Sequence, residues 1–311
     1  MRILIIGPGA VGCYFGSLLA RAGHAVTFAA RPTTAAALRG SGIRIEGSRG
    51  AWTVTDISVA SEATEPTDID VALLCVKLYD TASAARQWQP ALARAKAVVS
   101  LQNGVDAIER LDEALAGRAA PPRYGGLAFV AGQLVAPGHV RCTSDMSSIR
   151  FGGPGATTDP TLLAFADACV RAGFAADCLD DIASAQWHKF AGLATNAALT
   201  CLVRKPAGAC YGDDEIVRLA VQSIAEIIAV GTAAGATFPA GFADDTLRFL
   251  QGLPADMFAS MHHDLAAGKQ LELDALSGHV VRSGRRHGIA TPFHHMAWAC
   301  LRPHLDGDQP P

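Results

Sequence analysis

Residues 2–12 read RILIIGPGAVG, an apolar run of strand length that leads directly into the glycine pattern G-x-G-x-x-G. Residues 13–22 can continue as a helix, so the glycines stand at a strand-to-helix junction, the context that a dinucleotide-binding fingerprint requires. The first glycine allows the tight turn, the second lets the backbone approach a pyrophosphate, and the third lets the helix pack against the strand. The helix N-terminus offers free N–H groups to the phosphates. The stretch predicts a dinucleotide site, rather than a glycine-rich turn without a ligand, at Gly7, Gly9, Ala10, Val11 and Gly12.

The bulk composition is that of a globular protein of about two domains. The chain has 311 residues, of which 50% are hydrophobic and 18% are charged, and its net charge is −3. This length supports a large hydrophobic core. The slightly negative net charge gives no electrostatic reason to expect nucleic acid or an anionic membrane as a partner.

No stretch of the sequence is typical of a targeting or membrane segment. Residues 3–20 carry no charge, but glycines and Pro8 interrupt them, and the apolar run from Ile227 onward is closed by Pro239. The eight cysteines include no C-x-x-C pair and lie mostly in apolar surroundings, where cysteine behaves as a small core residue. These features predict a protein of a reducing compartment, the cytoplasm.

The residue that ends the second strand bears on the choice between the two nicotinamide dinucleotides. Residues 24–30 are typical of this strand, and Arg31 follows it at the place where an acidic residue would bind the ribose 2′-hydroxyl of NAD. No carboxylate appears here before Glu46. The guanidinium of Arg31 suits a 2′-phosphate, so NADP(H) is favoured over the alternative of a plain surface arginine.

Two continuous apolar runs predict strands that are buried on both faces. Lys77 follows residues 71–76. The tripeptide Gln-Asn-Gly, with Asn103 at its centre, follows residues 97–101. Ligands of open parallel sheets lie outside the carboxyl ends of the strands, so both side chains are expected to face the cofactor. A solvated lysine and a turn-forming asparagine are the alternatives, and the matching placement favours the cofactor.

Shorter segments complete the first domain. The strands that we expect to extend the sheet in antiparallel fashion are turn-rich and comprise residues 123–130, 133–136, 140–142 and 148–151. The other expected elements are a helix at 33–39, a hairpin of 43–46 with 52–59, a helix at 160–172 and a strand at 174–178.

From Asp181 onward strand signals largely stop, and helical patterns broken by glycine and proline continue to the end. The expected helices are residues 182–203, 214–234, 243–250, 255–267, 273–287 and 293–303. The predicted fold class is α/β, with a Rossmann-type domain followed by an all-helical domain. We expect an NADP(H)-binding domain at 1–179, a helical substrate and dimerisation domain at 180–305, and a disordered tail at 306–311.

Several blocks in the second half match a known family in order. Residues 187–193 read WHKFAGL, residues 259–265 read ASMHHDL, residues 268–274 read GKQLELD and residues 287–292 read HGIATP. Together with the fingerprint, Arg31, Val76-Lys77 and the LQNG block around Asn103, these blocks resemble the ketopantoate reductase (2-dehydropantoate 2-reductase) family from residue 1 to about residue 300.

The resemblance implies reduction of a branched 2-oxo acid to the 2-hydroxy acid with NADPH. Lys189 resembles the catalytic lysine of W-x-K, and Glu272 resembles the glutamate of the E-[IL]-D block. Ser260, before Met in S-M-x-x-D, is implied to bind substrate. The resemblance also implies that Lys77 contacts the cofactor, that Asn103 contacts both cofactor and substrate, and that Arg31 binds the 2′-phosphate.

The chemistry of such a reduction suits these residue types. Hydride arriving at the C2 carbonyl leaves negative charge on oxygen, which a lysine can stabilise and protonate if burial brings its pKa toward working pH. A nearby Glu272 would raise that pKa, so the two influences compete at Lys189. Glu272 can also hold a substrate hydroxyl or orient Lys189, and Ser260 can bond the substrate carboxylate.

The sequence departs from the family at three positions where asparagine is common. These are Leu193 and Ala197, four and eight residues after the lysine, and Met257, three residues before Ser260. Asn196 returns to within roughly 20° of the face of the lysine on a helix, so it is a candidate substrate contact or a plain helical asparagine. An apolar pocket discriminates weakly for a substrate hydroxyl, so the reaction type transfers better than the substrate.

Three other readings of the chain stay open or are disfavoured. A reductase of another branched or apolar 2-oxo acid, or of an unrelated carbonyl or imine, fits Leu193 and Ala197. A non-catalytic NADP(H) sensor has no need of Lys189 and Glu272. The histidines show no metal-ligand spacing, so no metal is expected. We also expect a homodimer that forms through the helical domain.

Overall fold

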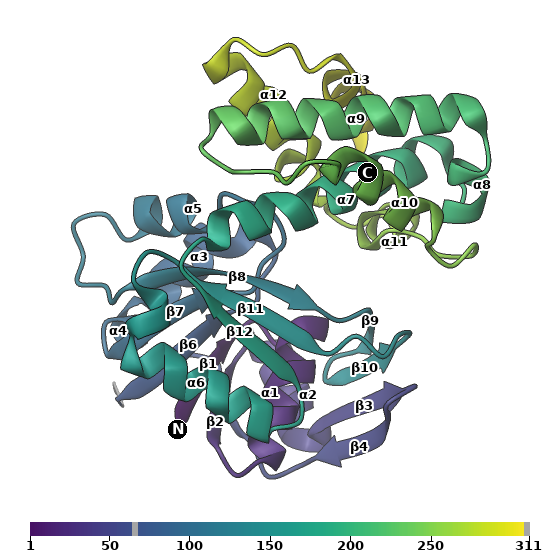
Figure 1. The fold of residues 1–311 in the computed structure, drawn as a ribbon. Helices are drawn as coiled ribbons and strands as arrows, with labels where there is room; N and C mark the ends of the chain where they lie inside the picture. The colour runs from purple at the N-terminus through teal and green to yellow at the C-terminus, as the bar shows by residue number, and fades with distance from the viewer. Residues whose placement is uncertain (64–67, 308–311) are drawn as a thin grey trace. The chain divides into compact units, whose positions relative to one another are not determined.

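The computed structural model describes residues 1–63 and 68–307, and the chain divides into two compact units, Met1–Ile182 and Ala183–Pro311. The first unit holds every strand of the described residues, and the second is built from helices (Figure 1). This is the expected α/β unit followed by a helical one. Residues 308–311 of the predicted disordered tail lie outside the described residues. Just before the tail, the carbonyl of Leu305 accepts the N–H of Leu271 at 2.9 Å.

The main sheet of the first unit has eight strands in the order β12-β11-β8-β7-β6-β1-β2-β5 (Figure 1). The six strands from β8 to β5 run parallel, while β11 is antiparallel to β8 and parallel to β12. The bounds of these strands are β1 Arg2–Ile6, β2 Ala25–Ala29, β5 Ser58–Ala60, β6 Ile69–Leu74, β7 Ala95–Ser100, β8 Arg123–Phe129, β11 Ser148–Gly152 and β12 Ala175–Leu179.

The central strands are apolar throughout because both faces of the sheet are covered. Side chains alternate along β1, so Ile3 and Ile5 join one core while Leu4 and Ile6 join the other. The first core is covered by α1 (Ala10–Arg21), α2 (Pro32–Ser41) and α6 (Pro160–Arg171). The second is covered by α3 (Thr81–Gln87), α4 (Gln89–Leu92) and α5 (Ala107–Ala114).

A second sheet corrects the prediction that residues 133–136 and 140–142 extend the main sheet. Its four strands have the order β4-β3-β10-β9, with bounds β3 Ile43–Gly47, β4 Gly50–Val54, β9 Gly132–Ala136 and β10 His139–Cys142. The expected hairpin forms between β3 and β4, and β10 pairs with β3 in parallel. Ile43, Ile45 and Val140 belong to the same core as α1. The pairing of β10 with the hairpin therefore buries one apolar face of the second sheet.

The predicted strand at 52–59 is also divided between the two sheets. β4 ends at Val54, and β5 begins at Ser58 and pairs with β2 in the main sheet. Thr55 and Asp56 between them are exposed, so the chain leaves one sheet and enters the other at this point.

The second unit contains seven α-helices among the described residues. They are α7 Ile182–Val203, which starts in the last residue of the first unit, α8 Ala207–Tyr211, α9 Asp214–Ala233, α10 Phe242–Gln251, α11 Ser260–Ala266, α12 Ser277–His287 and α13 Pro292–Leu301. A short 3-10 helix, η3 (Glu272–Asp274), precedes α12. Its core gathers apolar side chains of α7, α8, α9, α10 and α13, among them Leu199, Tyr211, Ile224, Leu250 and Phe293.

α9 is the one helix of the described residues that is long and apolar enough to cross a membrane. Its buried residues include Ser223, Ile224, Glu226 and Ile227, and Ile224 belongs to the core of the second unit. The length and apolar composition of α9 are therefore weak evidence for a membrane segment, since a helix in a protein core can have the same length and composition.

Two helical predictions in the second unit were inaccurate. α8 was not expected, and the helix expected from residue 255 begins at Ser260. The carbonyls of Ala255 and Met257 accept the N–H groups of Gly208 and Ala207 at 3.0 and 2.8 Å, so this segment bonds to α8 instead of forming its own helical turn.

We expect Gly208→Ala to lower the thermal midpoint of unfolding. A Cβ on Gly208 would lie 2.8 Å from the Cβ of Ala255 and 2.9 Å from its carbonyl oxygen. Such overpacking typically costs about 1–3 kcal/mol. Gly40→Ala is the matched control, because a Cβ there meets nothing within 4 Å and Gly40 lies inside α2. Calorimetry measures both variants, and an unchanged midpoint for Gly208→Ala would contradict the close approach.

Candidate active site

The turn between β1 and α1 requires two of its glycines for reasons internal to the protein. Gly7 has φ of 93°, and a Cβ on it would lie 2.5 Å from Val76 Cγ1. A Cβ on Gly12 would lie 2.5 Å from the carbonyl oxygen of Gly7. The first and third glycines of the fingerprint therefore serve the turn and the packing of α1 against β1, as the sequence predicted.

Gly9 differs from these two glycines because nothing lies within 4 Å of a Cβ added to it. It caps α1, which has no side-chain cap hydrogen bond and no acidic residue in its first turn. The first N–H groups of this 12-residue helix and its positive dipole end are thus available to an anion. Space beside Gly9 and an uncapped helix terminus suit a pyrophosphate. That Gly7, Gly9, Ala10, Val11 and Gly12 bind this pyrophosphate stays a prediction.

Lys77 and Asn103 follow neighbouring parallel strands, β6 and β7, at the carboxyl end of the sheet, where β1 leads into Gly7. Both residues are partly buried. The structure therefore brings the two predicted cofactor contacts to the same edge of the sheet as the glycine turn. Their contacts with a bound dinucleotide stay predictions.

Gln102 connects the two loops that carry these residues, and sequence reasoning missed it. Its buried side-chain Nε2 donates to the carbonyl of Val76 at 2.9 Å and to Thr81 Oγ1 at 2.8 Å, while Oε1 accepts from Ser100 Oγ at 3.0 Å. A glutamine directly after a buried apolar run was the available signal, because a buried amide must be hydrogen-bonded. Gln102 holds the Lys77 loop against the Asn103 loop.

Arg31 lies at the end of β2, next to the glycine turn, and caps α2. The N–H of Gly7 donates to the carbonyl of Ala29 at 3.1 Å, which ties the two strand ends together. The guanidinium of Arg31 pairs with Asp80 at 2.6 Å, and its side chain is 72% exposed. An exposed pair of this kind contributes about 0–1 kcal/mol, so it is weak enough to yield to a phosphate. The role of Arg31 toward a 2′-phosphate stays a prediction.

Lys189 and Glu272 both lie in the second unit and influence each other electrostatically. Lys189 is a partly buried residue of α7, and Glu272, which begins η3, is 6% exposed. Burial lowers the pKa of Lys189 to about 8, while the charge of Glu272 acts in the opposite direction and raises it. The competition expected from the sequence therefore exists in the fold, with burial as the larger influence.

The turn that holds Glu272 is fixed by backbone hydrogen bonds on both sides. The N–H of the preceding Leu271 donates to the carbonyl of Leu305 at 2.9 Å. The carbonyl of Glu272 accepts the N–H groups of Ala275 and Leu276 at 3.0 and 3.1 Å. Glu272 is therefore held by a rigid turn rather than by a flexible loop.

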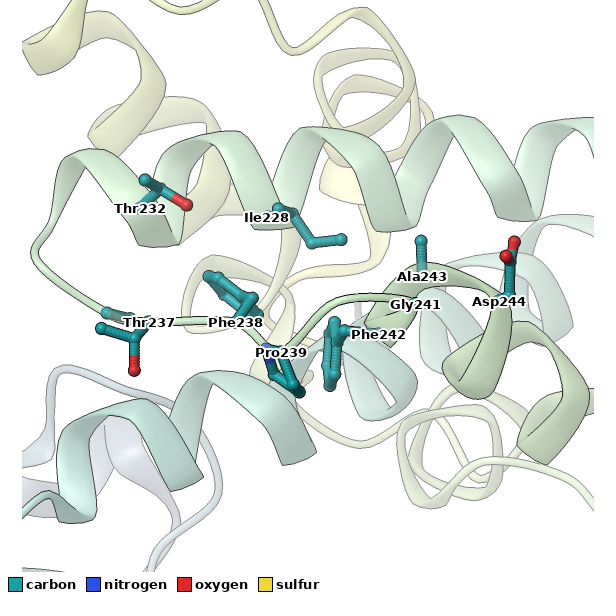
Figure 2. Close-up of a pocket in the computed structure, with 10 residues that line it drawn as sticks. Ile228, Thr232, Thr237, Phe238, Pro239, Gly241, Phe242, Ala243 and Asp244 are labelled. Carbon is teal, nitrogen blue, oxygen red and sulfur yellow. The ribbon is translucent and has the colours of Figure 1, made fainter.

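α7 is anchored directly beside Lys189. His188 Nε2 contacts the carbonyl oxygen of Thr237 at 2.7 Å, and its ring packs on Phe238 and Phe242. These two aromatic residues also line an open groove of about 690 Å³ between the end of α9 and the start of α10 (Figure 2). None of the predicted site residues lines this groove. Thr237, Phe238 and Phe242 hold α7 through His188.

The predicted substrate contacts differ in their surroundings. Ser260 is exposed at the first turn of α11. Asn196 is 7% exposed, and its Oδ1 accepts a hydrogen bond from the Tyr211 hydroxyl at 3.1 Å. Tyr211 lies on α8, which was not expected, so this partner could not be found from the sequence. Asn196 is thus an oriented amide on α7 rather than a freely solvated one.

The three positions that depart from the family are apolar and sheltered. Ala197 is 2% exposed, whereas Leu193 and Met257 are partly buried. Met257 packs against the core that contains Tyr211.

In residues 1–63 and 68–307, no group of three or more His, Cys, Asp or Glu side chains could hold a metal ion. All eight cysteines are free thiols.

Two family descriptions match the chain in succession. "Ketopantoate reductase PanE/ApbA" matches residues 3–155, and "Ketopantoate reductase PanE/ApbA C terminal" matches residues 181–304. The chain belongs to the ketopantoate reductase family. The resemblance predicted from the motif blocks is thereby confirmed, and the second match begins at residue 181, two residues before the helical unit.

Relatives match along almost the entire chain. The 2-dehydropantoate 2-reductase of Mycobacterium tuberculosis (strain ATCC 25618 / H37Rv) is 30% identical over 308 residues, which cover 98% of each chain. That of Caulobacter vibrioides is 30% identical over 302 residues, with 96% of this chain and 97% of the relative covered. These matches confirm the prediction of an oxidoreductase that acts on CH–OH groups.

Solved structures show the same fold. A PanE/ApbA family ketopantoate reductase from Ralstonia eutropha JMP134 is 31% identical, with a TM-score of 0.88 and 98% of each chain covered. D-mandelate dehydrogenase with NADH and anilino(oxo)acetate has a TM-score of 0.87 at 17% identity, with 98% of each chain covered, which shows the fold alone. The α/β fold class with a helical second domain is confirmed. Membership of the ketopantoate reductase family supports the expectation of a nicotinamide dinucleotide, which for this family is NADPH.

We expect Gly9→Ala to abolish tight dinucleotide binding without disturbing the fold. The added Cβ meets no heavy atom of the protein within 4 Å but occupies the space through which a pyrophosphate approaches. The dissociation constant for NADPH, measured by calorimetry, should rise about tenfold or more, a loss of at least about 1.4 kcal/mol. Gly40→Ala, equally free of neighbours, should bind normally. Wild-type affinity in Gly9→Ala would remove this turn from the cofactor site.

Proposed function

We propose that this protein reduces a 2-oxo acid to the 2-hydroxy acid with NADPH, and that its default substrate is ketopantoate (2-dehydropantoate). The observation that carries the proposal is the lysine of the helical unit. Lys189 has a pKa of about 8 beside the buried Glu272, in a chain whose first unit holds a dinucleotide turn with space for a pyrophosphate. The full-length relatives named 2-dehydropantoate 2-reductase support the same reaction.

Lys189 acts as the general acid in this proposal. NADPH, when bound, supplies the hydride that reaches C2 of the substrate. Negative charge then develops on the carbonyl oxygen, and an ammonium group placed there stabilises this charge and donates its proton. With a pKa of about 8, Lys189 is mostly protonated at neutral pH and still gives up its proton readily.

Glu272 keeps Lys189 in its proton-donating form. Burial alone favours the neutral amine, and the carboxylate raises the pKa of Lys189 against that influence. Glu272 also has the acceptor oxygens to hold a substrate hydroxyl. Ser260 supplies a hydroxyl group for the carboxylate of the substrate.

The choice of substrate depends on Leu193, Ala197 and Met257. Their apolar side chains offer no hydrogen bond to a hydroxyl, so a second candidate function is the reduction of another branched or apolar 2-oxo acid. Asn196, oriented by Tyr211, is the polar group on α7 that distinguishes these substrates. A hydroxyl-bearing acid would use it, and a purely apolar one would not.

We also propose that the protein acts in the cytoplasm as a homodimer. The free thiols of all eight cysteines fit a reducing compartment. A dimeric ketopantoate reductase from Staphylococcus aureus, 20% identical, has the same fold with a TM-score of 0.81. Sedimentation of the purified protein measures its oligomeric state, and a monomer at micromolar concentration would contradict the dimer.

Oxidation of NADPH by the purified protein, with ketopantoate and a panel of other 2-oxo acids, tests the proposed reaction. Turnover of ketopantoate with a kcat/KM far above that of the other acids is the expected result. A preference for an acid without a hydroxyl would move the substrate to the second candidate. Tight NADPH binding without turnover of any 2-oxo acid would contradict the proposed reaction.

Replacement of Lys189 by alanine should reduce kcat by about two orders of magnitude or more, as expected when a general acid is lost. NADPH affinity should change little, because the fingerprint lies in the first unit. Lys205→Ala is the control, since Lys205 is an exposed lysine of the same unit. Steady-state kinetics decide the matter, and near-normal turnover of Lys189→Ala would exclude Lys189 as the proton donor.

Arg31→Ala should weaken NADPH and leave NADH nearly unchanged, because only NADPH carries the 2′-phosphate. Arg39→Ala is a matched control, as Arg39 is an exposed arginine of the same helix, α2, whose side chain donates to the carbonyl of Val59. The ratio of the two cofactor dissociation constants is the quantity to measure. Equal losses for both cofactors would defeat the assignment of Arg31.

A further inference from the structure

A continuous chain of buried hydrogen bonds crosses the helical unit. Thr195 Oγ1 lies 2.7 Å from Ser223 Oγ, which lies 3.0 Å from His294 Nε2. The other ring nitrogen, His294 Nδ1, lies 3.1 Å from Ser277 Oγ. All four side chains belong to residues with 0% exposure. We call these four residues the His294 chain.

The two ends of the His294 chain lie on the elements that carry Lys189 and Glu272. Thr195 is a residue of α7, six residues after Lys189. Ser277 is the first residue of α12, five residues after Glu272 at the start of η3. Between these ends the chain passes through Ser223 on α9 and His294 on α13. One line of hydrogen bonds thus connects four helices, α7, α9, α13 and α12, of which α7 carries Lys189.

His294 is able to join two hydroxyl groups because it stays neutral. Burial lowers the pKa of its imidazole to about 3, so the ring carries one N–H donor and one acceptor nitrogen at any working pH. Serine and threonine hydroxyls both donate and accept, so every bond of the chain has a donor and an acceptor whichever tautomer is present. The chain is therefore fully satisfied.

Glu226 holds the backbone of His294 in place. Its buried carboxylate accepts the N–H groups of Phe293 and His294, in the first turn of α13, at 2.8 and 3.0 Å. Gln222 Nε2 donates to the same carboxylate at 3.3 Å. His294 is thus fixed to α9 through both its main chain and its side chain, which leaves it little freedom to tilt.

A core of apolar side chains would pack these helices without requiring one arrangement. Buried polar groups are costly unless they are paired, and a fully paired network is satisfied in one arrangement of its elements. A shift of α12 against α7 would leave at least one buried group without its partner. The His294 chain therefore has the property needed to fix the position of the Glu272 turn against α7.

We propose that the His294 chain is a positioning network that sets Glu272 against Lys189, with His294 as its central positioning residue. The proposal rests on the proposed function for its effect on turnover. Its effect on Lys189 itself does not depend on turnover, because the charge of Glu272 acts on Lys189 in the free protein.

The test measures the pKa of Lys189 from the pH dependence of its labelling by an amine-specific reagent, with peptide mass spectrometry to identify Lys189. The variants are His294→Phe, which removes both ring bonds, and Thr195→Val and Ser277→Ala, which each break one end with almost no change of shape. His295→Phe is the control, because His295 is an exposed neighbour on α13. His294→Gln, which restores a donor and an acceptor, serves as the rescue.

We expect the pKa of Lys189 to fall by about 0.5 or more in Thr195→Val and in Ser277→Ala, because Glu272 no longer raises it fully. The double variant should show no larger fall than either single variant, since one break already uncouples the two ends. kcat should fall about tenfold or more with the KM for NADPH unchanged. His294→Phe should lower the pKa of Lys189 and kcat in the same way, and His294→Gln should recover part of both losses. His295→Phe should change neither quantity.

Folded variants with lower thermal midpoints but an unchanged pKa of Lys189 would overturn the proposal, since the chain would then serve stability alone. A pKa that rises toward that of free lysine would also overturn it, because that result means entry of water rather than displacement of Glu272. If His294→Phe does not fold, the two end variants decide. A wild-type protein that reduces no 2-oxo acid would defeat the proposed function, whereas the labelling would still decide the role of the His294 chain.

Discussion

The position of Glu272 beside a partly buried Lys189 is the interaction on which the proposed chemistry depends. Burial lowers the pKa of Lys189 to about 8, and the charge of Glu272 opposes any further fall. A solvated lysine would hold its proton too tightly, and a buried lysine without a carboxylate would have a still lower pKa. Three features of the second unit hold the elements that carry this pair. They are the backbone hydrogen bonds of the η3 turn, the anchoring of α7 by His188, and the hydrogen bonds that run through His294.

The first unit reaches its function by a different route, in which the backbone matters more than side-chain chemistry. Gly7 and Gly12 are required because neighbouring atoms leave no room for a Cβ. Gly9 has that room, and the space beside it is what a pyrophosphate needs. Gln102 then ties the Lys77 loop to the Asn103 loop, so the segments that follow the carboxyl ends of β6 and β7 are held together.

The parts of the fold that follow from local pattern could be predicted from the sequence. The β1–α1 junction, the buried strands β6 and β7 and the long helix α7 each have a continuous apolar or periodic signature. The pairing of β10 with β3 could not be predicted, because the residues that form their shared buried face lie far apart in the sequence. α8 was missed because its surroundings, the carbonyls of Ala255 and Met257, come from a distant segment.

The site shows the same division. Lys189 and Glu272 could be proposed only through their motif blocks, since a single lysine or glutamate in a helical pattern carries no signal of its own. The roles of Gln102, Tyr211 and His294 were missed because a polar side chain in the sequence does not indicate which partner it will meet. Their hydrogen bonds exist only once separate elements have packed.

The pH dependence of kcat/KM for the 2-oxo acid, at saturating NADPH, tests the central claim about Lys189 most directly. Reduction needs the protonated amine, so the rate should fall as pH rises through the Lys189 pKa of about 8. Glu272→Gln removes the charge that raises this pKa, so the fall should begin at lower pH, whatever the absolute rate. A profile that does not bend near this pKa, or whose midpoint Glu272→Gln leaves in place, would contradict the account.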